Sequence, residues 1–210
     1  MNMRSVRKKL NKMTVEQLLK TIIDIKSSID GLKDTMEHPK YYYKWRFKLR
    51  KARQLKFYRE YLIETKRALA EKGFEYVPDD LEQIENQFNE SLDKIKTITL
   101  KINDAWFMFC KNISIRILEN SIQKIVNERN SETLIVSKED FLSSLYDLHL
   151  GEWRESYYGW GCLDGYNWEL IVEWTCGEKI SYYGSNSFPY NLNELIDLFD
   201  CRYEAQDIYR

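Results

Sequence analysis

The sequence predicts an α+β protein in which an antiparallel, coiled-coil-like helical hairpin precedes a mainly antiparallel sheet with two packed helices. Apolar residues recur at helical spacing up to about residue 92 and alternate with polar residues from about residue 97. Glycine (8) and proline (3) are scarce among 210 residues, which favours long regular elements. We therefore divide the chain into a basic helical domain, residues 1–95, and an acidic α+β domain, residues 96–210.

The first helix is predicted to begin at Thr14, because Thr14 and Gln17 form a capping-box pattern. Steps of three and four residues then alternate along its apolar positions, as in the heptad seam of a coiled coil. Ile23 is expected to widen this apolar stripe. The seam consists of Val15, Leu18, Ile22, Ile25, Ile29, Leu32 and Met36.

A second helix is predicted from Pro39 through Leu69, ending before Gly73. The short connection between the helices makes the pair antiparallel. Because each helix buries only one seam, we expect a third helix, a partner chain or the other domain to cover the pair. A helix over about 81–92, capped by Asp79 or Asp80, can do so. The apolar line of the second helix is Trp45, Leu49, Ala52, Leu55, Tyr58, Leu62, Thr65 and Leu69.

Strict alternation predicts strands over residues 97–103 and 113–117, and a looser alternation continues over 121–128. One long helix over 80–128 is the competing interpretation. It would place β-branched residues at every second position, which helices disfavour. We therefore predict strands.

The remaining elements follow from caps and turns. Ser137 is predicted to cap a helix reaching Leu148, and Asn191 a last helix over 192–199. Residues 168–175 and 179–183 form a predicted hairpin. The polar tail after residue 200 is predicted to fray.

Three short motifs in the second half of the chain resemble those of a known protein domain. They are Gly151-Glu152-Trp153, then Leu163-Asp164-Gly165 with Trp168 three residues later, then Gly184-Ser185-Asn186-Ser187-Phe188-Pro189. With them, residues 141–199 resemble a small α+β domain of uncharacterised proteins from Gram-positive bacteria and their mobile elements. The resemblance implies the fold and no established activity. Where that pattern has Thr-Gln or similar before the tryptophan, this chain has Tyr166-Asn167.

These motif residues are typical of structural roles. Asp164-Gly165 and Gly184-Ser185-Asn186 predict turns with positive φ. We predict that the core is filled in part by the tryptophans Trp153, Trp168 and Trp174. Their buried indole N–H groups then need hydrogen-bond acceptors.

The charges are segregated along the chain. The totals, 32 basic and 33 acidic residues, nearly cancel, but residues 1–73 hold 20 basic and 8 acidic side chains, and residues 74–210 hold 12 and 25. There is no apolar run near 18 residues, so no membrane span or membrane partner is predicted. The basic N-terminus lacks the apolar stretch of a signal peptide, and the four cysteines never form a CxxC pair, so a reduced, cytoplasmic protein is predicted.

The strongest functional pattern lies between His38 and Arg59, where nine basic side chains and several aromatic ones occur without an acid. Basic groups neutralise phosphates, and aromatic rings such as Trp45 stack on unpaired bases. A merely solvated helix face is the simplest alternative, but like charges at this density repel. An acidic partner is therefore expected: nucleic acid, a nucleoprotein complex, an acidic protein surface or the chain's own acidic half. The basic residues are Lys40, Lys44, Arg46, Lys48, Arg50, Lys51, Arg53, Lys56 and Arg59. The basic start of the chain can extend this patch or form a disordered arm.

No catalytic signature accompanies this pattern. The chain has two histidines and no phosphate-binding glycine loop, and carboxylates such as Glu152 and Glu155 show no directed pairing. His149 is interpreted as a hydrogen-bonded structural histidine. We therefore predict no enzyme, no cofactor and no metal site.

The predicted function is non-catalytic binding or inhibition. The helical arm engages nucleic acid or a nucleoprotein complex, and the α+β domain docks on protein. By analogy with small mobile-element proteins, the partner can be a host-defence nuclease, as for anti-CRISPR inhibitors. The alternatives are a coiled-coil adaptor that forms a homodimer through its hairpin, an acidic mimic that blocks a DNA- or RNA-binding channel and, with least support, a nuclease or transferase.

Overall fold

The computed structural model describes residues 3–38, 45–104, 110–127, 130–134, 136–159 and 165–199. The chain divides into two compact units, Met1–Pro78 and Asp79–Arg210. This boundary differs from the expected one after residue 95. The reason is helix α4 (Asp80–Glu90), which packs against the 3-10 helix η3 (Leu150–Glu152) of the second unit.

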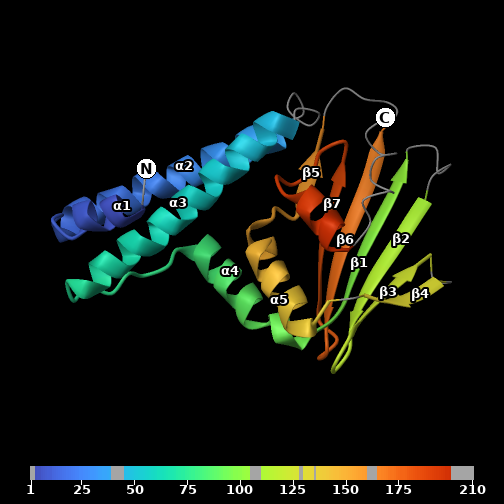
Figure 1. The fold of residues 1–210 in the computed structure, drawn as a ribbon. Coiled ribbons are helices and arrows are strands. Elements are labelled where there is room, and N and C mark those ends of the chain that lie inside the picture. The colour runs from blue at the N-terminus through green and yellow to red at the C-terminus, as the bar shows by residue number, and fades with distance from the viewer. Residues whose placement is uncertain are drawn as a thin grey trace. The chain divides into compact units, whose positions relative to one another are not determined.

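The first unit is helical. It contains α1 (Met3–Leu10), α2 (Val15–Glu37) and α3 (Trp45–Glu71), and α2 and α3 lie side by side in opposite directions (Figure 1). The predicted capping box is present at the start of α2. Thr14 Oγ1 accepts a hydrogen bond from the Gln17 backbone N–H at 3.3 Å, and Gln17 Oε1 accepts one from the Thr14 backbone N–H at 2.9 Å.

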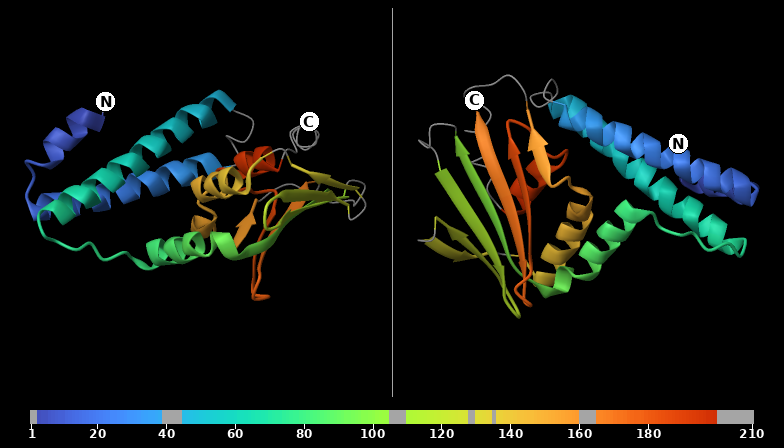
Figure 2. Two further views of the ribbon diagram at one scale, coloured as in Figure 1. Left: turned by 60° about the horizontal axis from the view of Figure 1, so that its bottom comes forward. Right: turned by 180° about the vertical axis from the view of Figure 1, so that it is seen from behind.

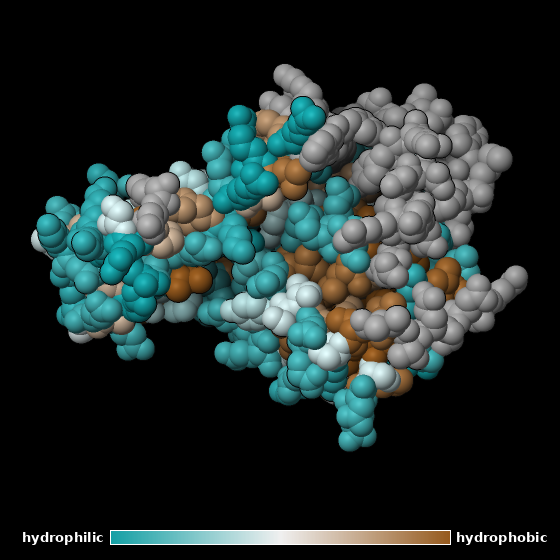
Figure 3. Space-filling view, viewed as in Figure 1, coloured by the Kyte–Doolittle hydropathy of each residue, from teal (hydrophilic) through white to brown (hydrophobic). Residues whose placement is uncertain are grey.

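The seam of α2 is buried as predicted, at every position from Leu18 to Met36, while Val15 is half-buried. The third helix is α1, because Val6 and Leu10 pack into one cluster with residues of α2 and α3. The basic start of the chain is therefore helical and not a disordered arm. The helix expected over 81–92 belongs to the second unit. The outer face of the helical unit is mostly hydrophilic in the view of Figure 3.

The predicted apolar line of α3 holds only in part. Leu55, Thr65 and Leu69 are buried, but Leu49 is 48% exposed. Three successive steps of three residues separate Leu49 from Tyr58, and each falls short of a full helical turn. At about 100° per residue, Leu49 therefore lies roughly 140° around the helix from Leu62. The expected contribution of Ile23 to the α2 stripe is also wrong, since this residue is 66% exposed.

The second unit is built on one sheet of seven described strands in the order β4-β3-β2-β1-β6-β7-β5. Neighbouring strands are antiparallel except for the parallel pair β5 and β7, so the predicted α+β class and mainly antiparallel sheet are confirmed. The strands are β1 (Ile95–Asp104), β2 (Cys110–Ile117), β3 (Ile122–Val126), β4 (Asn130–Thr133), β5 (Ser156–Tyr158), β6 (Tyr166–Trp174) and β7 (Lys179–Ser185). The short strands β4 and β5 were not predicted.

One face of this sheet carries the core. Helices α4, α5 (Lys138–Asp147) and α6 (Leu192–Leu198) gather on it (Figure 2). Alternate residues of the central strands are buried there, and Ile98 of β1 lies between Ile115 of β2 and Val172 of β6. This is the period-two burial that the alternating sequence predicted.

The caps in the second unit confirm two predictions and correct one. Asp79 forms a complete capping box with Glu82, and Ser137 Oγ accepts a hydrogen bond from the Asp140 backbone N–H at 3.0 Å. Asn191 precedes α6 without a side-chain cap. Its amide group instead accepts from Trp153 Nε1 and donates to the Leu148 carbonyl, because both partners lie beside it in the core.

The opposite face of the sheet is largely polar, and several of its charged side chains form ion pairs. Lys101 Nζ donates to Glu169 at 3.0 Å, and Lys96 and Lys179 contact the two oxygens of Glu173 at 2.8 and 3.1 Å. The residues after 200, predicted to fray, lie outside the described part of the chain. Among the described helices, none combines the length and apolarity needed to cross a membrane.

Candidate nucleic-acid interface

The predicted basic segment falls on α3. Lys40, Lys44 and the side chain of Trp45 lie outside the described part of the structure. The seven other predicted residues all belong to the N-terminal half of this helix. They are Arg46, Lys48, Arg50, Lys51, Arg53, Lys56 and Arg59.

Six of these residues form two rows on the helix, and Lys56 lies outside both. Lys48, Lys51 and Arg59 are half-buried, at positions seven or four residues from the buried Leu55. Arg46, Arg50 and Arg53, which we call the arginine row, are spaced by four and three residues and are all exposed. Such spacing places the three guanidinium groups on one face of the helix.

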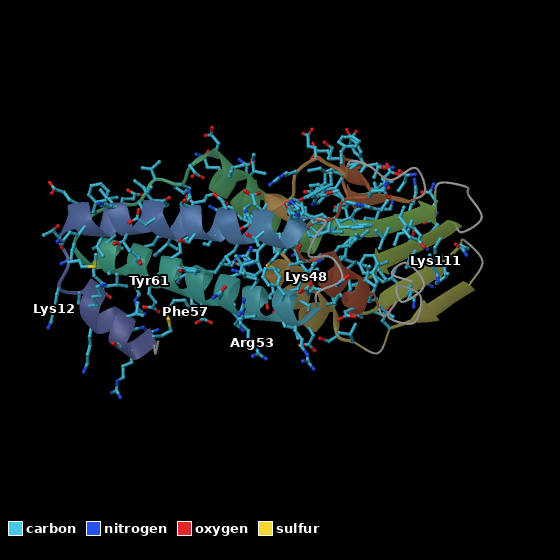
Figure 4. All side chains as sticks on the ribbon, turned by 90° about the horizontal axis from the view of Figure 1, so that it is seen from above. Lys12, Lys48, Arg53, Phe57, Tyr61 and Lys111 are labelled. Carbon is cyan, nitrogen blue, oxygen red and sulfur yellow. The ribbon has the colours of Figure 1, made fainter. Side chains whose placement is uncertain are left out.

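The arginine row is the first part of a longer stripe along α3. The same steps of four and three lead on through Phe57, Tyr61, Glu64 and Ala68. This second part faces α1, since Phe57, Tyr61 and Ala68 pack in the cluster that contains Val6. Figure 4 shows Arg53, Phe57 and Tyr61 one after another along the helix.

The length of α1 explains why one part of the stripe is apolar and the other part is basic. Its eight residues span about 12 Å, whereas the 23 residues from Arg46 to Ala68 span about 35 Å. An eight-residue helix can therefore cover only part of the stripe. The part that packs on α1 is aromatic and apolar, and the part beyond it is the arginine row.

Where α1 packs on α3, the charges are neutralised. Glu64 is buried and contacts Arg7 of α1 at 2.5 Å and Arg67 of α3 at 2.5 Å. The hydrogen bond from Arg7 is the main cause that lowers the pKa of Glu64 below its ordinary value, and the charge of Arg67 adds to it. This carboxylate is thus already shared by two guanidinium groups.

Some basic groups nearer the start of α3 have different surroundings. Arg50 and Lys51 lie over the ring of Phe47, at 5.9 and 5.5 Å from its centroid. Within the described residues, neither Arg53 nor Lys56 forms an ion pair. Contact with an aromatic face leaves the N–H donors at the edge of a guanidinium group available to a phosphate or carboxylate.

The aromatic residues of the segment have a more structural role than the sequence suggested. The ring of Phe57 lies 5.8 Å from Tyr58 and 6.1 Å from Tyr61, and all three side chains are half-buried. Burial raises the pKa of the Tyr61 hydroxyl. Phe57 and Tyr61 pack in the cluster that joins α1 to α3, which limits the surface that these two rings offer to a base.

A second group of exposed basic residues lies on the N-terminal segment of the chain. Lys8, Lys9 and Lys12 of the N-terminal segment are exposed, and Lys12 projects from the end of α1 (Figure 4). In the sequence, these lysines are recognisable as part of the basic start of the chain. Up to Pro78 the helical unit has 20 basic and 9 acidic residues, and the second unit has 12 and 24.

The motif residues of the second unit have structural roles where they are described. A Cβ at Gly165 would lie 1.5 Å from Asn186 Oδ1, and one at Gly184 would lie 2.4 Å from Trp168 Nε1. Of the described residues in these two predicted turns, Asn186 has a positive φ, at 54°. The two glycines are therefore needed for close packing and not for their backbone conformation. Leu163 and Asp164 lie outside the described residues.

Comparison with family models, with curated proteins and with solved structures gives no match to this chain. The resemblance over residues 141–199 therefore stays a prediction.

Proposed function

We propose that this protein binds nucleic acid without catalysing a reaction, and that the arginine row of α3 contacts the phosphate backbone. The observation that supports this proposal most is the change from apolar to basic residues along one stripe of α3. Where the stripe meets α1 it is apolar and its charge is neutralised. Beyond α1 it carries Arg46, Arg50 and Arg53 on one exposed face.

The spacing of the row suits a charged backbone. Successive residues of the row rise about 6 and 4.5 Å along the helix. A guanidinium group offers parallel N–H donors that bind two oxygens of one phosphate. Each neutralised phosphate releases counterions, so the affinity of such a surface depends strongly on salt and little on base sequence.

The proposal is tested by measuring the affinity of the full chain for single- and double-stranded RNA and DNA across a salt series. We expect the double variant Arg50→Gln/Arg53→Gln to bind about tenfold more weakly at low salt. The slope of log affinity against log salt should fall by roughly 1.4 for single strands, or about 1.8 for duplexes.

The matched control is Lys96→Gln/Lys101→Gln, which removes the same charge from the second unit. Both lysines are about half exposed, and each contacts a glutamate. This control should retain the wild-type affinity and salt slope. Absence of wild-type binding to all four nucleic acids at low salt would contradict the proposal and favour an acidic protein partner. An equal loss in both double variants would show that net charge and not the arginine row determines binding.

The inhibitor role expected by analogy is a narrower form of this proposal. A nuclease whose guide or target strand is occupied by the arginine row would lose cleavage in the presence of the wild-type protein and regain it with Arg50→Gln/Arg53→Gln. If the acidic unit instead acts as a nucleic-acid mimic, the double variant will inhibit as well as the wild type.

A further inference from the structure

Three side chains with metal-binding atoms meet in the second unit, outside the surface proposed above. Glu85 lies on α4, His149 immediately precedes η3, and Glu152 is the last residue of η3. Their ligand atoms all lie within 4.8 Å of one another. Glu85 Oε1 is 2.9 Å from His149 Nδ1.

The packing of α4 on η3 brings these groups together. Gly151 lies against α4, and a Cβ at this position would be 2.5 Å from Glu85 Oε2 and 2.8 Å from Glu85 Cα. The absence of a side chain at Gly151 therefore lets α4 pack closely on η3, with Glu85 Oε2 against Gly151. The capping box of Asp79 and Glu82 secures the start of α4 two turns before Glu85.

One oxygen of Glu85 has no partner. The residue is only 8% exposed. Its Oε1 accepts a hydrogen bond from Asn89 Nδ2 at 2.8 Å and lies beside His149. Its Oε2 is fully buried and has no hydrogen bond to any described residue. A buried carboxylate oxygen without a partner is unfavourable, and a bound cation removes this cost.

We propose that Glu85, His149 and Glu152 bind one divalent cation of the first transition row, such as Zn²⁺ or Mn²⁺. One imidazole nitrogen with two carboxylates is a donor set that these ions accept. The 2.9 Å between Glu85 Oε1 and His149 Nδ1 is near the separation of two ligand atoms that each lie about 2.1 Å from one ion. That separation is about 3 Å in octahedral and about 3.4 Å in tetrahedral coordination.

The surroundings of the three groups fit ligands. Asn89 donates to Glu85, and the hydroxyl of Tyr190 lies 3.5 Å from Glu152 Oε2. Hydrogen bonds of this kind orient metal ligands and raise metal affinity. His149 and Glu152 are partly exposed, so an ion can enter from solvent.

A simple ion pair between protonated His149 and Glu85 is the competing explanation. Such a pair leaves Glu85 Oε2 without a hydrogen-bond partner and does not involve Glu152. The metal site therefore requires the carboxylate of Glu152, whereas the ion pair does not.

The test is titration calorimetry of the chelator-treated full chain with Zn²⁺, and in parallel with Mn²⁺ and Mg²⁺. We expect one site, with tighter binding of Zn²⁺ than of Mg²⁺. Glu152→Gln and His149→Gln should each weaken Zn²⁺ binding at least tenfold. Glu155→Gln, which changes an exposed carboxylate outside the cluster, should bind Zn²⁺ as the wild type does.

Two results would overturn the inference. One is a wild-type chain that binds none of the three ions, as the ion pair requires. The other is Zn²⁺ affinity that is unchanged in Glu152→Gln, or reduced as much in Glu155→Gln. Circular dichroism of each variant establishes that it is folded, and Zn²⁺ should raise the melting temperature of the wild type but not of Glu152→Gln. Nucleic-acid binding is expected to survive the chelator, which separates this site from the proposed function.

Discussion

The two halves of α3 place the same helix stripe in two different environments. Its C-terminal half packs on α1 and α2, buries Leu69 completely and pairs Arg67 with Glu64. Its N-terminal half continues the same stripe with Arg50 and Arg53 and leaves Leu49 exposed. The stripe is therefore used for stability where α1 covers it, and it is available to a partner where α1 does not.

The largest expected difference between the two halves of α3 is the stability lost when a leucine is shortened to alanine. Leu69→Ala should lower the free energy of unfolding of the helical unit by about 2–5 kcal/mol, because it removes a fully buried side chain and leaves a cavity. Leu49→Ala, the same change on the exposed side, should cost no more than about 0.5 kcal/mol. Urea denaturation followed by circular dichroism measures both. Equal costs would show that the N-terminal half is packed as tightly as the C-terminal half.

A smaller effect concerns the charge that holds α1 on α3. The pKa of Glu64 is lowered in the folded state, mainly by its hydrogen bond with Arg7. Its contribution is therefore present above about pH 4.3, the ordinary pKa of glutamate, and is lost as pH falls through the lower folded value. Glu64→Gln should cost less than about 1 kcal/mol at pH 7, since both arginine partners are half exposed.

The pH dependence provides the control for this variant. The stability difference between wild type and Glu64→Gln should shrink as the pH is lowered below 4, when the glutamate is protonated like its neutral substitute. Glu60→Gln, an exposed change on the same helix, should show no such trend. A difference that grows in acid would contradict the assigned role of Glu64.

The smallest effect is expected from adding an acidic residue to the N-terminal half of α3. Leu49→Glu places a carboxylate four residues before Arg53, an arrangement that stabilises a helix by about 0.2–0.5 kcal/mol. The same carboxylate would compete with phosphates, so nucleic-acid affinity should fall. Leu49→Gln, which adds no charge, should change neither quantity. Weaker stability together with unchanged affinity would argue against the comparison of the two halves.

Local periodicity predicted most of the fold. The α2 seam, the caps at Thr14 and Ser137, and the strands β1, β2, β6 and β7 follow from patterns within a few residues. The arginine row was also recognisable, because its residues are neighbours on one helix. The helix α1 was harder to predict, since eight residues with only a few apolar positions form a stable helix only when they pack on something else.

The sequence by itself determined which segments are helices or strands and where the positive charge collects, because periods of 3.6 and 2 residues and runs of like charge are local properties. Only the tertiary structure decided that α1 and not α4 completes the helical unit, and that Leu49 lies outside the seam. It also decided that Glu85 meets His149 and Glu152 although 63 residues of chain separate Glu85 from His149. Those outcomes depend on which surfaces pack together, and packing joins residues whose distance along the chain carries no local pattern.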